Sequence, residues 1–135
     1  MKKFLFTFLL LCIICGINAK AQITVFSQNK CHFDKLSVIL KMWKEELAPL
    51  LNAQVDAGKL SGWGILTHRW GDEWNFNVYY NAKNISEFES AFNEVIKKWE
   101  EKFPEGMKRV SEACFEHKDS YYNSAYQYPI PEEEN

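Results

Sequence analysis

Large apolar and polar side chains alternate along residues 63–80, WGILTHRWGDEWNFNVYY, a segment that holds three of the five tryptophans. Alternation with a period of two is typical of β-strands, and the Gly71-Asp72 pair favours a turn. We therefore predict a β-hairpin from about Gly62 to Tyr80. Bulky residues fall on both faces of this hairpin, which indicates a sheet that is covered on both sides.

Apolar residues recur every three or four positions between Asp34 and Gly58, which is the period of an amphipathic helix. Asp34 is a candidate N-cap, and Gly58 is suited to end the helix. Pro49 lies inside the pattern and removes a backbone donor, so we expect one helix with a kink near this residue. The apolar stripe consists of Leu36, Ile39, Leu40, Trp43, Leu47, Leu51 and Val55.

A second amphipathic stripe follows the hairpin. Ser86 and Glu89 match a capping box at its start, and the sequence Pro104-Glu105-Gly106 would end the helix. Its buried face is expected to contain Phe88, Phe92, Val95, Ile96, Trp99 and Phe103.

Two further strands complete the predicted order. One runs from Ile23 to His32, although the polar residues 27–30 weaken its pattern, and the other runs from about Ala113 to Tyr122. The order strand, helix, strand, strand, helix, strand is the β-α-β-β-α-β arrangement of ferredoxin-like α+β folds. It predicts a four-stranded antiparallel sheet with two helices on one face and the first strand between the third and the last. Because two helices cover only one face, we expect a second subunit on the other face, which would make a homodimer.

Residues 1–21 have the features of a signal peptide. Two lysines precede an apolar run, and residues 19–21 match an A-x-A cleavage site. The run is shorter than the roughly 20 residues that span a bilayer, so no stable membrane insertion is expected after cleavage. We predict an exported protein, periplasmic or secreted, with one domain at 22–122 and an irregular or disordered acidic tail at 123–135.

The charge of the mature chain excludes one class of partner. Removal of the signal peptide takes away three lysines and no acidic residue, which leaves 13 basic and 18 acidic residues and a formal net charge of −5. A mildly acidic domain without a basic stripe argues against nucleic acid as a partner.

The chain resembles the dimeric α+β barrel superfamily, which includes stress-responsive A/B barrel proteins, small cofactor-free monooxygenases, lactone isomerases and haem-dependent relatives. The resemblance covers about Ile23 to Tyr122. It rests on the element order, the long first helix that ends near Gly58, the segment WGILTHRWGDEWN, and EHKD in the last strand. It implies pairing through the sheets and a cavity between the sheet and the helices. No catalytic motif of the superfamily is carried over to these positions.

Under this fold the first and last strands are antiparallel neighbours, which bears on the two cysteines that remain after signal cleavage. Cys31 would end the first strand and Cys114 would begin the last, so the two would face each other. An oxidising compartment favours a disulfide, and closing so long a loop would contribute about 4–5 kcal/mol. Two unpaired buried thiols are the alternative.

The register of the hairpin decides where His68 lies, and the sequence leaves two registers open. In one register, His68 sits beside Phe76 in an apolar layer. In the other, it neighbours Asn75 and Asn77 and forms a small polar cluster suited to a ligand pocket.

The last strand places His117 and Asp119 on one face. A carboxylate two residues from an imidazole can orient it and raise its basicity, as general acid/base chemistry requires. His68, His117 and Asp119 are therefore candidate catalytic residues. The alternative is that the polar residues of this strand meet solvent or stabilise the dimer.

After the predicted signal peptide, which carries the C-x-x-C pair Cys12 and Cys15, no close-spaced ligand pair such as C-x-x-C or H-x-x-x-H occurs, so we expect no metal site and no cofactor. The preferred interpretation is an exported protein that binds a small apolar or aromatic molecule. A cofactor-independent monooxygenase or isomerase that uses a histidine acid/base is the alternative, and aromatics that serve only the core and the dimer interface are a third interpretation. The candidate ligand-binding residues are Trp63, Trp70, Asn75, Asn77 and Tyr79, together with His68, His117 and Asp119.

Overall fold

The computed structural model of the protein describes residues 23–68 and 73–125. The predicted signal peptide, the Gly71-Asp72 turn, Trp70 and residues 126–135 lie outside the described residues. The strands are β1 (Ile23–Cys31), β2 (Gly62–Thr67), β3 (Phe76–Ala82) and β4 (Cys114–Asn123). The helical segments are η1 (Phe33–Lys35), α1 (Leu36–Met42), η2 (Trp43–Leu47), α2 (Ala48–Asp56), α3 (Ile85–Lys102) and α4 (Gly106–Ala113).

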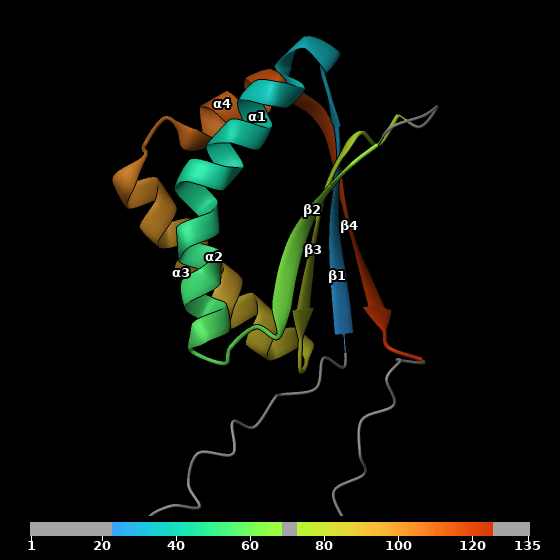
Figure 1. Ribbon diagram of the computed structural model, residues 1–135, viewed down its shortest axis with the longest axis vertical. Coiled ribbons are helices and arrows are strands. Elements are labelled where there is room, and N and C mark those ends of the chain that lie inside the picture. The colour runs from blue at the N-terminus through green and yellow to red at the C-terminus, as the bar shows by residue number, and fades with distance from the viewer. Residues whose placement is uncertain (1–22, 69–72, 126–135) are drawn as a thin grey trace, which may run out of the picture.

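The strands form one antiparallel sheet in the order β2-β3-β1-β4. β1 lies between β3 and β4, as right-handed crossovers predict. The described helices all lie on one side of the sheet (Figure 1). This is the ferredoxin-like α+β arrangement expected from the element order, and that prediction is confirmed.

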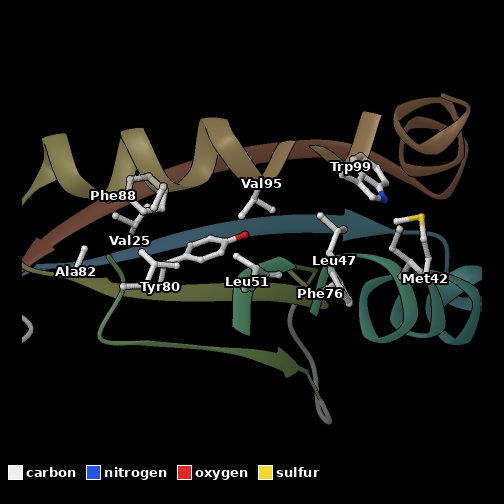
Figure 2. Close-up of a cluster of buried hydrophobic side chains, with 14 of the residues drawn as sticks. Val25, Met42, Leu47, Leu51, Phe76, Tyr80, Ala82, Phe88, Val95 and Trp99 are labelled. Carbon is white, nitrogen blue, oxygen red and sulfur yellow. The ribbon is translucent and has the colours of Figure 1, made fainter. Parts of the chain in front are cut away.

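The core lies between the sheet and the helices. Alternate residues of β3, from Phe76 to Ala82, are buried and face the helices, which is the pattern of a strand with one covered face. Among the opposing helical residues (Figure 2), the two predicted apolar stripes supply Leu47, Leu51, Phe88, Val95 and Trp99. Met42 is also buried there (Figure 2), although neither predicted stripe contained it.

The first helical segment is continuous from Leu36 to Asp56 but changes type in the middle. A π-helical stretch, η2, separates α1 from α2, and Pro49 lies in the first turn of α2. Pro49 can neither donate a backbone hydrogen bond nor tolerate the carbonyl one turn earlier, and the wider π turn accommodates both defects. The predicted irregularity near Pro49 is confirmed. Gly58 has a φ of 71° and follows the end of α2, as expected.

Two predicted helix starts are wrong. Asp34 lies inside the 3₁₀ turn η1, and α1 begins at Leu36 without a side-chain cap. The cap of α3 is made by Asn84 and Glu87 instead of Ser86 and Glu89. Asn84 Oδ1 accepts from the Glu87 backbone nitrogen at 2.9 Å, and Asn84 Nδ2 donates to Glu87 Oε1 at 3.0 Å. Asparagine caps as well as serine does, so both positions were chemically suitable.

Helix α4 was not predicted, because Gly106 was interpreted as a helix breaker. Gly106 instead starts α4 and lies against the indole of Trp99, where a Cβ would come within 2.5 Å of the ring. The missing side chain allows α4 to pack closely on the end of α3. Among the described residues, the helical layer therefore contains one more helix than the expected two.

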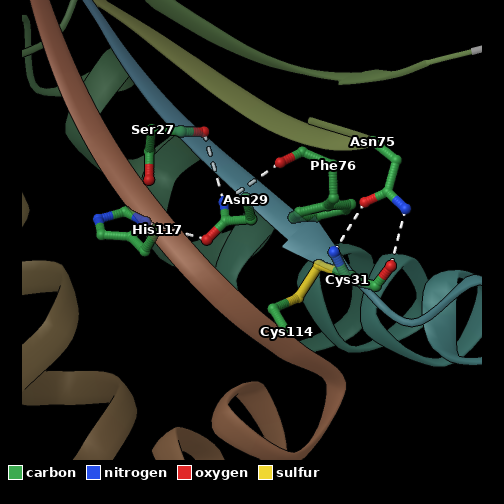
Figure 3. Close-up of a disulfide and its surroundings, with 7 residues drawn as sticks. All are labelled: Ser27, Asn29, Cys31, Asn75, Phe76, Cys114 and His117. Carbon is green, nitrogen blue, oxygen red and sulfur yellow. Dashed lines mark hydrogen bonds between the residues drawn. A yellow bond between two sulfur atoms is a disulfide. The ribbon is translucent and has the colours of Figure 1, made fainter. Parts of the chain in front are cut away.

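A disulfide joins Cys31 at the end of β1 to Cys114 at the start of β4 (Figure 3). The ladder shifts between Lys30 and Cys31, so that Lys30 pairs with Glu116 while Cys31 pairs with Cys114. Phe115 is thus the extra residue of a β-bulge. The disulfide expected from the fold is present.

Candidate functional site

Cross-strand pairs determine which side chains share a face, because residues opposite each other in a ladder point the same way. Val25 of β1 lies opposite Tyr80 of β3 and Tyr121 of β4, and this row faces the helices. Phe26 of β1 lies opposite Tyr79 and points to the other side. The side of the sheet that bears Phe26 and Tyr79 is called the open face below.

The hairpin has the register in which His68 neighbours Asn75. Thr67 lies opposite Phe76, and the backbone nitrogen of His68 donates to the Asn75 carbonyl at 3.2 Å. By alternation from Thr67, His68 falls on the open face and not beside Phe76 in the apolar layer. Of the two registers that the sequence leaves open, the protein has the polar one.

The asparagines of this register hydrogen-bond to the backbone. Asn75 Nδ2 donates to the Cys31 carbonyl at 2.7 Å, and Asn75 Oδ1 accepts from the Cys31 nitrogen at 2.8 Å (Figure 3). Asn77 Nδ2 donates to the Trp74 carbonyl at 2.9 Å. Asn75 therefore uses both ends of its amide to hold the end of the sheet together, whereas Asn77 Oδ1 has no hydrogen-bond partner among the residues that the structure describes.

The remaining predicted lining residues are divided between the two faces. Trp63 faces the helices, and its indole nitrogen donates to Asn52 Oδ1 at 2.9 Å. Tyr79 lies on the open face with its ring over Gly64, where a Cβ would come within 2.6 Å of the ring. Trp70 lies outside the described residues. The predicted set therefore does not line one common pocket.

His117 of β4 is held between Asn29 and Asp119 on the side that faces the helices. Its Nδ1 lies 3.0 Å from Asn29 Oδ1, and its Nε2 lies 3.2 Å from Asp119 Oδ2. Asn29 is buried, and its Nδ2 donates to the backbone carbonyls of Ser27 at 3.4 Å and Phe76 at 3.2 Å (Figure 3). Because both amide hydrogens are engaged, only the carbonyl oxygen of Asn29 is directed at the imidazole.

The phenol of Tyr80 places a polar atom in the core. Tyr80 is 1% exposed, and its hydroxyl has no hydrogen-bond partner among the residues that the structure describes. The ring packs on Phe88 and Phe92 with centroid distances of 5.4 and 5.3 Å, and the hydroxyl points away from Ala82 into the core (Figure 2). Burial raises the pKa of Tyr80, and the charge of Asp119 raises it further, so the phenol is neutral.

The helix-facing side of β4 is less covered than the rest of the sheet. The His117 and Asp119 side chains are 52% and 44% exposed, and Tyr121 is also exposed. Tyr121 meets Phe88 of α3 edge to face, with a centroid distance of 6.2 Å. We define the β4 site as Asn29, Tyr80, His117, Asp119 and Tyr121.

A concave feature lies between α1 and α4, away from the β4 site. It is a groove of about 170 Å³ whose lining includes Met42, Glu46 and Arg109. The Arg109 guanidinium donates to both oxygens of Glu46, so these polar groups are already paired. Within 23–68 and 73–125, no three histidine, cysteine or acidic side chains are grouped to hold a metal ion. No helix in the same ranges has the length and hydropathy to cross a membrane.

Sequence reasoning singled out His117 and Asp119 but missed Asn29 and Tyr80. The polar residues 27–30 were a signal, since they interrupt an otherwise apolar strand, and one of them is the buried partner of His117. The sequence pattern predicts Tyr80 to be an ordinary aromatic residue of the core. No local pattern reveals that its hydroxyl lacks a partner, because that depends on what packs around it.

Solved structures with a similar backbone support the topology. A dimeric ferredoxin-like protein from an uncultured marine organism aligns over 82% of this chain and 94% of its own, with a TM-score of 0.65 and 12% identity. The chain has a ferredoxin-like α+β fold. A NIPSNAP family protein of unknown function from Agrobacterium tumefaciens aligns over 82% of this chain and 95% of its own, with a TM-score of 0.64 and 8% identity.

A third similar structure, from Nitrosomonas europaea, is provisionally assigned as an antibiotic biosynthesis monooxygenase. It aligns over 77% of this chain and 99% of its own, with a TM-score of 0.57 and 13% identity. Identities this low establish the fold and not the activity. No protein-family model and no curated protein matches the sequence.

Proposed function

We propose that the protein binds a small apolar or aromatic molecule at the β4 site. The observation that carries this proposal is the Tyr80 hydroxyl, which is buried without a partner in the described chain and lies within the electrostatic reach of Asp119. Phe88 and Tyr121 provide aromatic surface beside the His117–Asp119 pair. Apolar walls with a few well-placed polar groups are typical of small-molecule sites.

Thermal-shift titration with 1-naphthol and indole tests this proposal. Binding to the folded state raises Tm in proportion to the logarithm of ligand concentration. We expect stabilisation of the wild-type protein and its loss in His117→Ala. His68→Ala is the matched control, because His68 falls on the open face. A ligand whose effect is the same in all three proteins would contradict the assignment, as would the absence of stabilisation by either compound.

The proposed oligomer is a homodimer formed through the open face. Phe26 contacts Tyr79 and Tyr122 there, with ring centroids 6.1 and 5.8 Å apart, and Leu66 and Tyr122 are each about half exposed. A cluster of aromatic and aliphatic side chains on an uncovered sheet is typical of a protein interface. Two of the similar solved structures are described as dimeric ferredoxin-like proteins, which supports this choice of partner.

Light scattering tests the dimer. Leu66→Lys and Tyr122→Lys are expected to shift the mass from dimer to monomer, since each would bury an unpaired ammonium group in the interface. Met107→Lys is the control, because Met107 is an exposed apolar residue of α4 on the helical side. A wild-type monomer at micromolar concentration would refute the interface.

We also propose that the protein is exported. The basic and apolar N-terminal pattern supports this proposal, and so does the disulfide between Cys31 and Cys114, since such bonds persist in oxidising compartments. Mass spectrometry of protein from the native cell is expected to find Gln22 as the first residue and both cysteines oxidised. If most of the protein keeps its N-terminal 21 residues, export with removal of a signal peptide is refuted.

A second candidate function is a cofactor-independent monooxygenase or isomerase in which the His117–Asp119 pair exchanges a proton with the substrate. The contact of 3.2 Å between Nε2 and Oδ2 favours it, because a positioned imidazole and carboxylate are the components of acid/base catalysis. Oxygen uptake in the presence of 1-naphthol distinguishes the monooxygenase from a binding protein, and a changed product spectrum without uptake would indicate the isomerase. Uptake that is lost in His117→Ala supports the enzyme, and binding without turnover supports the first function.

A further inference from the structure

The hydrogen bonds of Asn29 determine which imidazole nitrogen of His117 carries a hydrogen. Both amide hydrogens of Asn29 are donated to backbone carbonyls, so the group that faces His117 is the oxygen Oδ1. An oxygen without a hydrogen can only accept, and Nδ1 must therefore be an N–H to form the bond of 3.0 Å. This is the opposite of the Nε2–H tautomer that a free neutral histidine prefers.

The other nitrogen of His117, Nε2, faces Asp119 Oδ2 at 3.2 Å. A nitrogen lone pair and a carboxylate oxygen repel each other, so the pair is stable only with a hydrogen between them. With Nδ1 directed at Asn29 and Nε2 directed at Asp119, each nitrogen of His117 already contacts a group within the protein.

Asp119 has one oxygen left over. Its Oδ2 faces His117, whereas Oδ1 makes no hydrogen bond to any residue that the structure describes. The side chain is 44% exposed on the helix-facing side of β4. The chain from Asn29 through His117 to Asp119 therefore ends in a carboxylate oxygen that a ligand can reach.

We propose that Asp119 binds the ligand directly through Oδ1, that His117 is a positioning residue, and that the ligand donates its hydrogen bond from a hydroxyl group. This rests on the proposed ligand-binding function and names the chemical group that the site recognises. A hydroxyl can donate a hydrogen bond to the Asp119 carboxylate. It also brings no charge into the aromatic surroundings of Phe88 and Tyr121.

A matched pair of ligands tests the recognised group. 1-Naphthol and 1-methoxynaphthalene share a ring system, but only the first can donate a hydrogen bond. We expect the methyl ether to bind at least about tenfold more weakly than 1-naphthol. This is the usual effect of losing a hydrogen bond to a charged group. Equal affinity of the two compounds overturns the proposal that a hydroxyl is recognised.

Variants at positions 117 and 119 separate the binding residue from the positioning residue. Asp119→Leu removes the hydrogen-bond acceptor and is expected to lower the affinity for 1-naphthol by about tenfold or more. His117→Gln keeps an amide donor for Asp119, and its affinity for 1-naphthol is expected to stay within about threefold of the wild-type affinity. Wild-type affinity in Asp119→Leu overturns this inference alone. No stabilisation of the wild-type protein by any probe counts against the proposed function and this inference with it.

The tautomer supplies a test that needs no ligand. Proton–nitrogen correlation NMR spectra of the imidazole are expected to show a hydrogen on Nδ1 of His117 in the neutral-pH protein. Asn29→Ala removes the acceptor and is expected to shift the neutral ring toward the Nε2–H form. A wild-type His117 whose Nδ1 carries a lone pair overturns the proposed arrangement.

Discussion

Glu46 and Arg109 form a two-point ion pair, in which Nη1 and Nη2 each lie 2.7 Å from a separate carboxylate oxygen. The same carboxylate accepts from the indole nitrogen of Trp99 at 3.0 Å. Glu46 belongs to η2, Trp99 to α3 and Arg109 to α4, so one side chain joins three helical segments. The Glu46 side chain is only 13% exposed, whereas that of Arg109 is 40% exposed, so the carboxylate is the better shielded partner of the pair.

Glu46→Gln is expected to destabilise the protein at neutral pH and to do so less as the pH falls. Hydrogen bonds from Arg109 hold the pKa of Glu46 below its ordinary value, although burial acts in the opposite direction. A lowered pKa stabilises the fold above the ordinary glutamate pKa, and this contribution is lost as the pH falls through the folded-state value. Thermal melts from neutral pH down to the folded-state pKa of Glu46 measure the difference in stability between wild type and Glu46→Gln. Glu45→Gln, an exposed neighbour, is the control, and a constant difference between wild type and Glu46→Gln would contradict the prediction.

Gly64→Ala is expected to destabilise the protein by about 1–3 kcal/mol, the usual cost of overpacking. The new Cβ would come within 2.6 Å of the Tyr79 ring and force it off the sheet. Gly62→Ala is a control from the same strand, because its Cβ would meet Asn81 Nδ2 only at 3.9 Å. Urea denaturation gives both values. The double variant Gly64→Ala/Tyr79→Ala should cost less than the sum of its single changes, and strict additivity would show that the two sites are not coupled.

Replacing both Cys31 and Cys114 with serine is expected to lower stability by about 4–5 kcal/mol in the chain-entropy treatment of a long closed loop. The disulfide has a sequence separation of 83, so it restricts most of the unfolded domain. Denaturation with and without a reductant measures the effect. The reductant should leave the double-serine variant unchanged, and an equal response in both proteins would mean that the disulfide contributes nothing.

Tyr80→Phe is expected to stabilise the ligand-free protein by about 1–3 kcal/mol, because it removes a buried hydroxyl that has no partner in the described chain. Tyr79→Phe is the control, since Tyr79 is only partly buried on the open face. Denaturation midpoints compare the variants. A loss of stability in Tyr80→Phe would show that the hydroxyl has a partner, such as a bound water, and would weaken its use as a marker of the site.

The errors in the sequence-based interpretation share one physical cause. Ser86 and Asn84 are both good N-caps, and Gly106 is equally suited to end a helix or to let one pack closely. Local chemistry allowed each alternative. Contact with Trp99 decided the function of Gly106, and the packing of the whole helix decided where α3 begins.

The sequence alone determined the number and order of the strands, the two long helices, and the central place of β1. These features follow from periodicity and from the handedness of crossovers, which require no knowledge of distant contacts. Only the tertiary structure decided that His117 meets Asn29, 88 positions away, and that the Tyr80 hydroxyl is left without a partner in the described chain. Such contacts depend on ladder register, and a shift of one residue, such as the bulge beside Cys31, changes every pair beyond it.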